Sequence, residues 1–198
     1  MLEQFFGSKT RYELLNFFFN NKKRSFYVRE LASLTKMQLN SIRRELENLV
    51  KFGILTEDKN YRSSDEDKNK NFNLPIKRRY YKLNKDFVLY GEIETLIIKS
   101  KLLLENKLIE KLGAMGQIKT LLLTGIFTGA KNSPVDILII GEIKNKENLK
   151  ILIHEFGNFI NKDINYSLLT DDEYKYRWGI KDKFLFSILD SENMEIKG

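Results

Sequence analysis

The stretch from residue 26 to residue 55 reads FYVRELASLTKMQLNSIRRELENLVKFGIL. The spacing of its apolar residues predicts two short helices joined by a tight turn and followed by a strand. In the first helix we expect Leu31 and Leu34 to face inward. Gly53 stands where a glycine commonly ends a helix, and Ile54 begins the predicted strand. This order of elements decides how the first half of the chain folds.

The second predicted helix has two chemically different sides. An apolar stripe predicts a buried face, formed by Leu39, Ile42, Leu46 and Leu49. The opposite side carries amide, hydroxyl and guanidinium groups, from Gln38, Asn40, Ser41, Arg43 and Arg44. A helix that enters the major groove of DNA needs this mixture, because base edges and phosphates both lie within its reach. The alternative is ordinary solvated helix charge, with an arginine paired to Glu47.

The charge of the chain is unevenly distributed. Residues 1–86 hold 19 Lys/Arg and 11 Asp/Glu, whereas residues 87–198 hold 15 and 16. The net charge of +7 therefore comes from the first half. A basic half joined to a neutral half is typical of a polyanion-binding module linked to a module of another kind. A lysine-rich genome that loads every surface would instead spread the charge evenly.

Elements on either side of the quoted stretch complete a small domain. Ser8 is placed to cap a helix that runs to about Asn20. Residues 78–83 are expected to pair with the strand at Ile54, across a long polar loop. Basic residues outside the second helix stand at positions suited to phosphate contacts, namely Lys22, Lys23, Arg78 and Arg79. Contacts of this kind add affinity without sequence selectivity.

Three helices followed by a hairpin are the element order of a winged helix. On these residues, the segment from 8 to 83 resembles the winged-helix transcription regulators of the ArsR/MarR type. The resemblance implies a DNA-binding domain over residues 1–86, with duplex DNA as its partner. For Arg29, DNA contact and an ion pair with Glu30 both stay open.

Residues 84–113 show one long helical pattern, which predicts a connecting helix over 87–115. Its apolar stripe consists of Tyr90, Ile93, Ile97, Leu104, Leu108 and Leu112, and Gly91 is a weak point. One use of the stripe is pairing with a second copy, because winged helices usually read two half-sites as dimers. The other use is packing onto the flanking domains of the same chain. We therefore expect a homodimer and keep the second reading as its alternative.

The last part of the chain alternates between strands and helices. Buried strands are predicted at 117–123, 135–140 and 164–169, and a short edge strand at 194–197. Thr170 with Glu173 fits a capping box, which opens a helix that contains Tyr174, Tyr176 and Trp178. Those aromatic residues either pack in the fold or stack a base. The order predicts a domain over 116–198 with a mixed sheet, and an α+β class for the whole chain.

Between the first two of these strands the sequence reads TGIFTGAKNSPVDILIIG. With the surrounding layout, it resembles the minimal nucleotidyltransferase fold of the DNA polymerase beta superfamily, over roughly residues 116–190. In that family a Gly-Ser loop holds the nucleotide triphosphate. Two aspartates of a Ser-Asp-x-Asp strand and a third acid hold two magnesium ions, which activate the attacking oxygen.

This sequence departs from the family pattern at the chemical positions. The counterparts are Thr124 and Gly125 in place of Gly-Ser, Gly129 for the later glycine, Ser133 for the serine and Asp136 for the second aspartate. Pro134 replaces the first aspartate, and Asn165 or a neighbour replaces the third acid. One carboxylate cannot hold two magnesium ions in near-octahedral geometry. We therefore expect a vestigial nucleotide site without a bound metal, and no enzyme activity or cofactor.

Two interpretations of Asp136 stay open. As a structural residue it caps the end of its strand or pairs with Lys131. As a functional residue it keeps a single-metal or nucleotide contact.

Composition sets outer limits on the function. The chain has no cysteine and a single histidine, His154, so thiolate and multi-histidine metal sites are excluded. No apolar run reaches the roughly 18 residues that a membrane-spanning helix needs. The N-terminus does not show the pattern of a signal peptide, so we expect a cytoplasmic protein.

These features lead to the hypothesis of a DNA-binding transcriptional regulator. In it, the degenerate nucleotidyltransferase-like domain is a dimer scaffold, a partner surface or the pocket of a small-molecule or nucleotide effector. The first alternative is an active nucleotidyltransferase that modifies a protein or an RNA. The second is the antitoxin half of a toxin–antitoxin pair, because minimal nucleotidyltransferases often accompany a small helical toxin.

Overall fold

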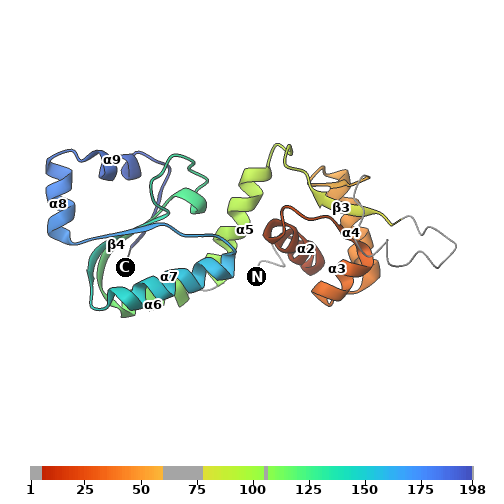
Figure 1. Cartoon of the computed structure of the whole chain (residues 1–198), viewed down its shortest axis with the longest axis horizontal. Helices are drawn as coiled ribbons and strands as arrows, with labels where there is room; N and C mark the ends of the chain where they lie inside the picture. The colour runs from red at the N-terminus through yellow and green to blue at the C-terminus, as the bar shows by residue number, and fades with distance from the viewer. Residues whose placement is uncertain (1–5, 60–77, 105–106, 198) are drawn as a thin grey trace. The chain divides into compact units, whose positions relative to one another are not determined.

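The computed structural model describes residues 6–59, 78–104 and 107–197. It divides the chain into two compact units, Met1–Tyr90 (unit 1) and Gly91–Gly198 (unit 2). Unit 1 joins helices to a three-stranded sheet, and unit 2 joins helices to a four-stranded sheet (Figure 1). The chain is therefore α+β, as predicted.

Unit 1 places three helices against a small antiparallel sheet. Its elements are α2 (Lys9–Asn20), β1 (Phe26–Tyr27), α3 (Val28–Thr35), α4 (Leu39–Lys51), β2 (Leu55–Glu57) and β3 (Tyr80–Leu83). The strand order is β1-β3-β2, so the strand that follows the long loop lies between the other two. Arg78 and Arg79 directly precede β3. The loop residues 60–77 lie outside the described ranges.

The core of unit 1 contains both aromatic and aliphatic side chains. The rings of Phe17 and Phe18 on α2 meet the ring of Phe26 edge to face, at centroid distances of 4.9 and 5.9 Å. Leu31 is fully buried, but Leu34 is 53% exposed, so the prediction that both face inward was wrong for Leu34. The short helix α3 buries Leu31 near its middle, whereas Leu34 stands one residue before its last residue and faces solvent.

Two residues in left-handed backbone set the limits of α4. Lys36 ends α3 with φ 56°, which reverses the chain within three residues before α4 begins. Gly53, with φ 86°, follows α4, and Ile54 N donates to Leu49 O at 3.0 Å. A glycine adopts this conformation without strain, which is the reason it commonly ends a helix. The predicted role of Gly53 is confirmed.

Unit 2 is built around a mixed sheet with the strand order β6-β5-β4-β7. Its elements are α5 (Tyr90–Leu104), α6 (Lys107–Ala114), β4 (Gly116–Leu123), η1 (Gly125–Phe127), β5 (Ile137–Ile143), α7 (Lys146–Ile160), β6 (Tyr166–Leu169), α8 (Asp171–Gly179), α9 (Lys183–Leu189) and β7 (Met194–Lys197). The strands β5 and β6 are parallel and joined through α7, whereas β4 is antiparallel to both of its neighbours.

The sheet of unit 2 is covered on both faces. Leu123 and Ile139 belong to a core that also contains residues of α5, α6 and α7. Leu122 and Leu138 belong to a second core, together with Leu185 and Ile188 of α9. Successive residues of a strand point to opposite faces, so these strands are apolar at nearly every position.

The predicted second strand differs from the observed one at both ends. It was expected over 135–140 with Gly141 as its end, whereas β5 runs from Ile137 to Ile143 through Gly141. Gly141 has φ 149°, and a Cβ there would lie 2.2 Å from Gln117 O, beside a register shift in β4. The glycine thus lets the two strands approach closely and does not end the strand.

The described residues show two helices in the region of the predicted long connecting helix. Residues 84–89 form turns, α5 begins at Tyr90, and α6 begins at Lys107 after two residues outside the described ranges. Ile98, Leu102, Leu108 and Leu112 are buried in the core of unit 2. Of the predicted stripe, Leu108 and Leu112 thus pack within unit 2, whereas Ile98 and Leu102 were not predicted as part of it. Pairing with a second copy stays a prediction.

Candidate nucleic-acid interface

The helix α4 presents its polar side to solvent. Gln38 is the residue that precedes its first turn, and Asn40, Arg43 and Arg44 are exposed with it, whereas Ser41 is half-buried. No side-chain hydrogen bond or ion pair joins these five residues to another residue within the described ranges. The structure therefore brings together the five predicted residues of α4 on a surface whose donors and acceptors face water.

The other side of α4 fixes the helix in unit 1. Ile42, Leu46 and Leu49 are at most 1% exposed. Contacts between α4 and the elements α2, α3 and β2 surround this side. Burying three such side chains contributes roughly 1.5–3 kcal/mol each, so the direction of the polar side is set by packing.

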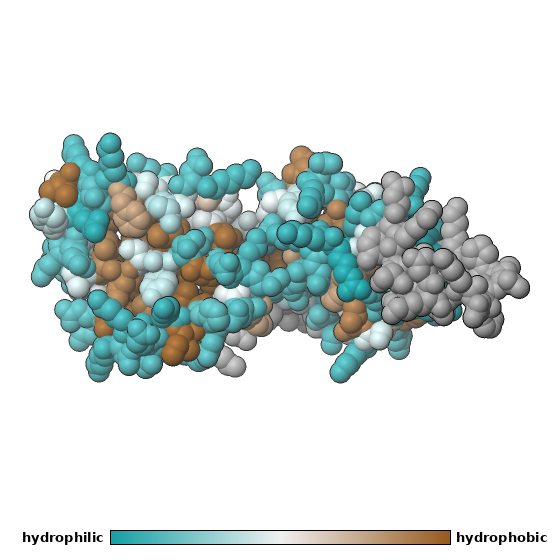
Figure 2. Space-filling view, viewed as in Figure 1, coloured by the Kyte–Doolittle hydropathy of each residue, from teal (hydrophilic) through white to brown (hydrophobic). Residues whose placement is uncertain are grey.

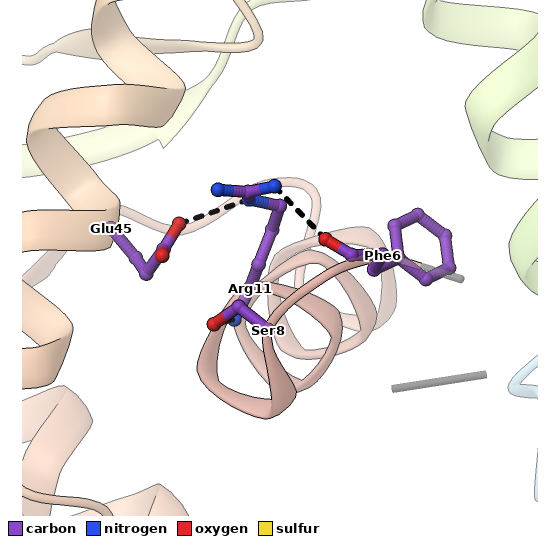
Figure 3. Close-up of polar contacts among 4 residues, drawn as sticks. All are labelled: Phe6, Ser8, Arg11 and Glu45. Atoms are coloured by element: carbon purple, nitrogen blue, oxygen red, sulfur yellow. Dashed lines mark hydrogen bonds and ion pairs between the residues drawn. The ribbon is translucent and has the colours of Figure 1, made fainter. Parts of the chain in front are cut away.

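A buried acid lies inside the apolar side of α4. Glu45 is 4% exposed, and its Oε2 accepts a hydrogen bond from Arg11 Nε of α2 at 3.0 Å (Figure 3). A second nitrogen of Arg11 donates to Phe6 O at 2.9 Å, and Ser8 accepts from Arg11 N at 3.2 Å as the predicted cap of α2. A charge in such a place is stable only when it is paired and hydrogen-bonded. The pair ties α4 to the start of α2.

Sequence reasoning missed this pair. The available signal was the position of Glu45, which falls between Ile42 and Leu46 on the apolar stripe. The partner stands 34 residues away, so no local pattern could identify Arg11.

The hairpin arginines have partners in unit 1. The Arg78 guanidinium lies 4.9 Å from the centre of the Tyr27 ring, and a nitrogen of Arg79 lies 3.7 Å from Glu57 Oε1. Burial raises the pKa of the Tyr81 hydroxyl, and the nearby Glu57 carboxylate raises it further. The Arg79 pair is exposed, and exposed pairs are worth about 0–1 kcal/mol, so this arginine can exchange partners at little cost.

Lys22 and Lys23 are separated from the residues of α4. Together with Lys82 and Lys85 they line a cleft of about 580 Å³ beside the sheet of unit 1. The nine residues predicted to contact DNA thus fall into three groups, one on α4, one before β3 and one in this cleft. Arg29 is exposed, and Glu30 is paired with Arg24.

In unit 2, the loop that carries the predicted nucleotide-binding residues forms its side-chain hydrogen bonds within the chain itself. The Thr124 hydroxyl is fully buried, lies 2.9 Å from Ser191 Oγ, and donates to Glu192 O at 3.1 Å. The Thr128 hydroxyl also donates to Glu192 O, at 2.8 Å. Ser133 donates to Val135 O at 2.7 Å. Of the three hydroxyls, none is left to hold a phosphate without breaking a contact of the fold.

Asp136 accepts hydrogen bonds with both carboxylate oxygens. Ile126 N donates to Oδ1 and Asn165 N donates to Oδ2, each at 2.9 Å, and the residue is 7% exposed. The carboxylate thereby joins η1 to the residue before β6. The structural interpretation of Asp136 is favoured, but its partners are two backbone amides instead of Lys131.

Gly125 allows this close approach. Its φ is +52°, and a Cβ at this position would lie 2.2 Å from Asp136 Oδ1. Only glycine fits here without displacing the carboxylate. Gly129 also has a positive φ of 84°, but it is exposed. A Cβ placed at Gly129 would lie 3.4 Å from its nearest neighbour, Thr95 Oγ1.

Other candidate residues of unit 2 form no cluster with Asp136. Within the described ranges, no three His, Cys, Asp or Glu side chains come together in a way that could hold a metal ion. His154 is exposed on α7 beside Asn158. Trp178 is half exposed, and its ring lies 5.3 Å from that of Phe186 and 6.0 Å from that of Tyr174. These contacts favour packing over base stacking for Trp178.

Comparison with models of known protein families, with curated proteins and with solved structures gave no match to this chain. Among the helices of the described ranges, none combines the length and the apolar composition that crossing a membrane requires.

Proposed function

We propose that this protein binds duplex DNA through α4 and regulates transcription. The observation that carries the proposal is that α4 has one polar, exposed side and one apolar, buried side. Arg43, Arg44 and the amides of Gln38 and Asn40 face solvent, while Ile42 and the paired Glu45 fix the opposite side. A rigid helix with exposed arginine and amide groups is suited to contacts with base edges in the major groove.

The order of elements in unit 1 supports the same proposal. A three-residue turn joins α3 to α4, and the sheet follows with β1 beside β3. This order supports the proposal of a winged helix-turn-helix, in which the second helix reads the groove. Arg78 and Arg79, which precede β3, would contact phosphates beside it and add affinity that does not depend on sequence. A homodimer that reads two half-sites is part of the proposal.

We further propose that unit 2 is not a nucleotidyltransferase. The Asp136 carboxylate is engaged by two backbone amides, and the hydroxyls of Thr124, Thr128 and Ser133 are engaged by the fold. A loop of this kind supports a structural role or a partner surface more than phosphate transfer. A small-molecule or nucleotide effector, if one binds the protein, needs a different site from this loop.

The test is a titration of labelled genomic fragments, captured by the full-length protein, at several salt concentrations. Affinity for duplex should fall steeply as salt rises, because bound lysines and arginines release counterions. The double variant R43Q/R44Q should bind about ten- to a hundredfold more weakly, since two charge-assisted contacts are lost. The slope of the logarithm of affinity against the logarithm of salt concentration should fall by about two.

The matched control is K144Q/K150Q, which removes two exposed charges from unit 2. It should leave duplex affinity close to that of the wild type. Equal losses in the two double variants would show that only overall charge matters, and the role of α4 would be rejected. Absence of duplex binding at low salt would reject the function itself.

A further inference from the structure

The cleft in unit 1 is a second basic feature besides the exposed side of α4, and it is concave. We call it the lysine cleft. It has a volume of about 580 Å³, and its lining includes Lys22, Lys23, Thr56, Asp58, Lys82 and Lys85. Pockets for small molecules commonly measure about 300–1,000 Å³.

Strand alternation places this cleft on the sheet face away from the helices. Leu55 and Leu83 are paired across β2 and β3 and are buried, and Leu55 lies on the strand that contacts α4. Thr56 and Lys82 form the next pair, so their side chains point to the opposite face. The side of the sheet that lines the cleft is therefore not the side on which α4 packs.

A central carboxylate holds the base of the cleft together. Asp58 Oδ2 accepts a hydrogen bond from the Ser25 hydroxyl at 2.7 Å and lies 3.1 Å from Lys82 Nζ. Ser25 is 3% exposed. These contacts connect the segment before β1 to both strands of the hairpin. These contacts thus fix the positions of the lysine-bearing segments relative to one another.

The cleft keeps an excess of positive charge after this pairing. Its four lysines face two aspartates, and the Asp58 charge is already matched by Lys82. Lys23 and Lys85 are exposed, and neither forms an ion pair with another residue of the described ranges. Asn84 is committed to the fold, because its amide nitrogen donates to Gly53 O at 2.9 Å and its oxygen accepts from Asp86 N at 3.2 Å.

We propose that the lysine cleft binds the phosphate group of a small phosphorylated molecule. Ammonium groups on separate segments suit a compact dianion, which accepts hydrogen bonds from several directions. The Thr56 hydroxyl adds a neutral donor at the same place. This site is independent of the proposed DNA binding by α4, since it uses other residues on another face of unit 1.

A phosphate in the cleft can come from a free molecule or from the backbone of DNA. The concave shape and the position behind the sheet favour the free molecule, because a duplex docked on the outer side of α4 lies away from this face. The experiment must therefore include both sources.

The probe is AMP, titrated into the full-length protein by calorimetry at constant ionic strength, with adenosine as the phosphate-free control. Wild type should bind AMP, and adenosine should bind much more weakly or not at all. The variant K23Q/K85Q should bind AMP about ten- to a hundredfold more weakly, because two charge-assisted contacts are removed. The variant K144Q/K150Q should bind like the wild type.

Two results would overturn the proposal directly. One is equal affinity for AMP and adenosine, and the other is equal AMP affinity in wild type and K23Q/K85Q.

A further experiment distinguishes a free phosphorylated molecule from the DNA backbone, and the cleft proposal from the DNA-binding proposal. R43Q/R44Q should keep AMP binding in the lysine cleft even where its duplex affinity is lost. If unlabelled duplex displaces AMP from wild type and from R43Q/R44Q alike, the cleft is a DNA backbone site and the small-molecule proposal fails. If wild type binds AMP but no duplex, the proposal for the lysine cleft is supported and the proposed DNA function fails.

Discussion

The outer side of α4 and the loop from Thr124 to Asp136 both carry polar residues, but the two regions use them in opposite ways. On α4, the groups of Arg43, Arg44 and Asn40 point to solvent and have no partner in the described parts of the chain. In the loop, Thr124 and Asp136 are buried and hydrogen-bonded to backbone atoms. The polar groups of α4 are available to a ligand, whereas those of the loop stabilise the fold.

The surfaces of the two units differ in a related way. On the face drawn in Figure 2, hydrophilic side chains cover most of the described part of unit 1, and more hydrophobic side chains are visible on unit 2. Large exposed apolar residues occur on both units, however, and they include Phe52 and Val88 in unit 1 and Ile151, Phe159 and Ile180 in unit 2. The basic excess of the sequence thus belongs to the unit with the more hydrophilic visible face.

The largest expected effect on stability is that of D136N. The substitution removes one acceptor oxygen and turns an amide group toward a backbone donor, so one of Ile126 N and Asn165 N is left unpaired. Leaving such a buried donor unsatisfied costs about 1–3 kcal/mol, and the loss of the charge adds to it. Urea unfolding should therefore show unit 2 destabilised by about 2–3 kcal/mol.

The control for this change is D163N, at an exposed aspartate of the same unit, which should stay within about 0.5 kcal/mol of wild type. Equal stability of both variants would contradict the structural role of Asp136 as the acceptor of two backbone hydrogen bonds. Nucleotidyl transfer with Mg²⁺ or Mn²⁺ that is lost in D136N would show that the loop acts on a substrate after all.

A smaller effect is expected for E45Q in unit 1. The change removes the charge that pairs with Arg11, whose side chain is 32% exposed and can still reach water. Loss of stability should therefore be about 1–2 kcal/mol, below the cost of breaking a fully buried pair. The matched variant E47Q, on the exposed side of the same helix, should change the unfolding midpoint little. The same loss in both would mean that the pair with Arg11 contributes nothing specific.

The smallest effect on stability is expected for R43Q/R44Q. Both arginines are exposed and form no side-chain hydrogen bond or ion pair within the described ranges, so the free energy of unfolding should change by no more than about 0.5 kcal/mol. This variant is also the one expected to lose most duplex affinity. A large loss of stability would show that the outer side of α4 is part of the fold and would remove the contrast between the two regions.

Several local features were predictable from the sequence because neighbours in the chain determine them. Ser8 caps α2 through the nitrogen three residues later, and Thr170 with Glu173 forms the expected capping box. The apolar stripe of α4 is buried at Ile42, Leu46 and Leu49. The short edge strand at 194–197 is present and pairs with β4. Each of these follows from periodicity or from a hydrogen bond within one turn.

The features that were missed depend on long-range contacts. Leu34 satisfied the periodicity, but the core does not extend to it. The convergence of Lys22 and Lys23 with Lys82 and Lys85 follows from the pairing of β3 with β1 and β2. Since strand pairing brings together residues about 60 apart in the chain, no window of sequence contains this cleft.

The sequence by itself determined most of the helices and strands, and which side of α4 is polar, because these depend on spacing along the chain. Only the tertiary structure decided what the polar groups do. Asp136 meets Asn165 from 29 residues away, and Arg11 meets Glu45 from 34. A carboxylate is a ligand site or a structural contact according to the atoms that face it, and those atoms come from distant parts of the chain.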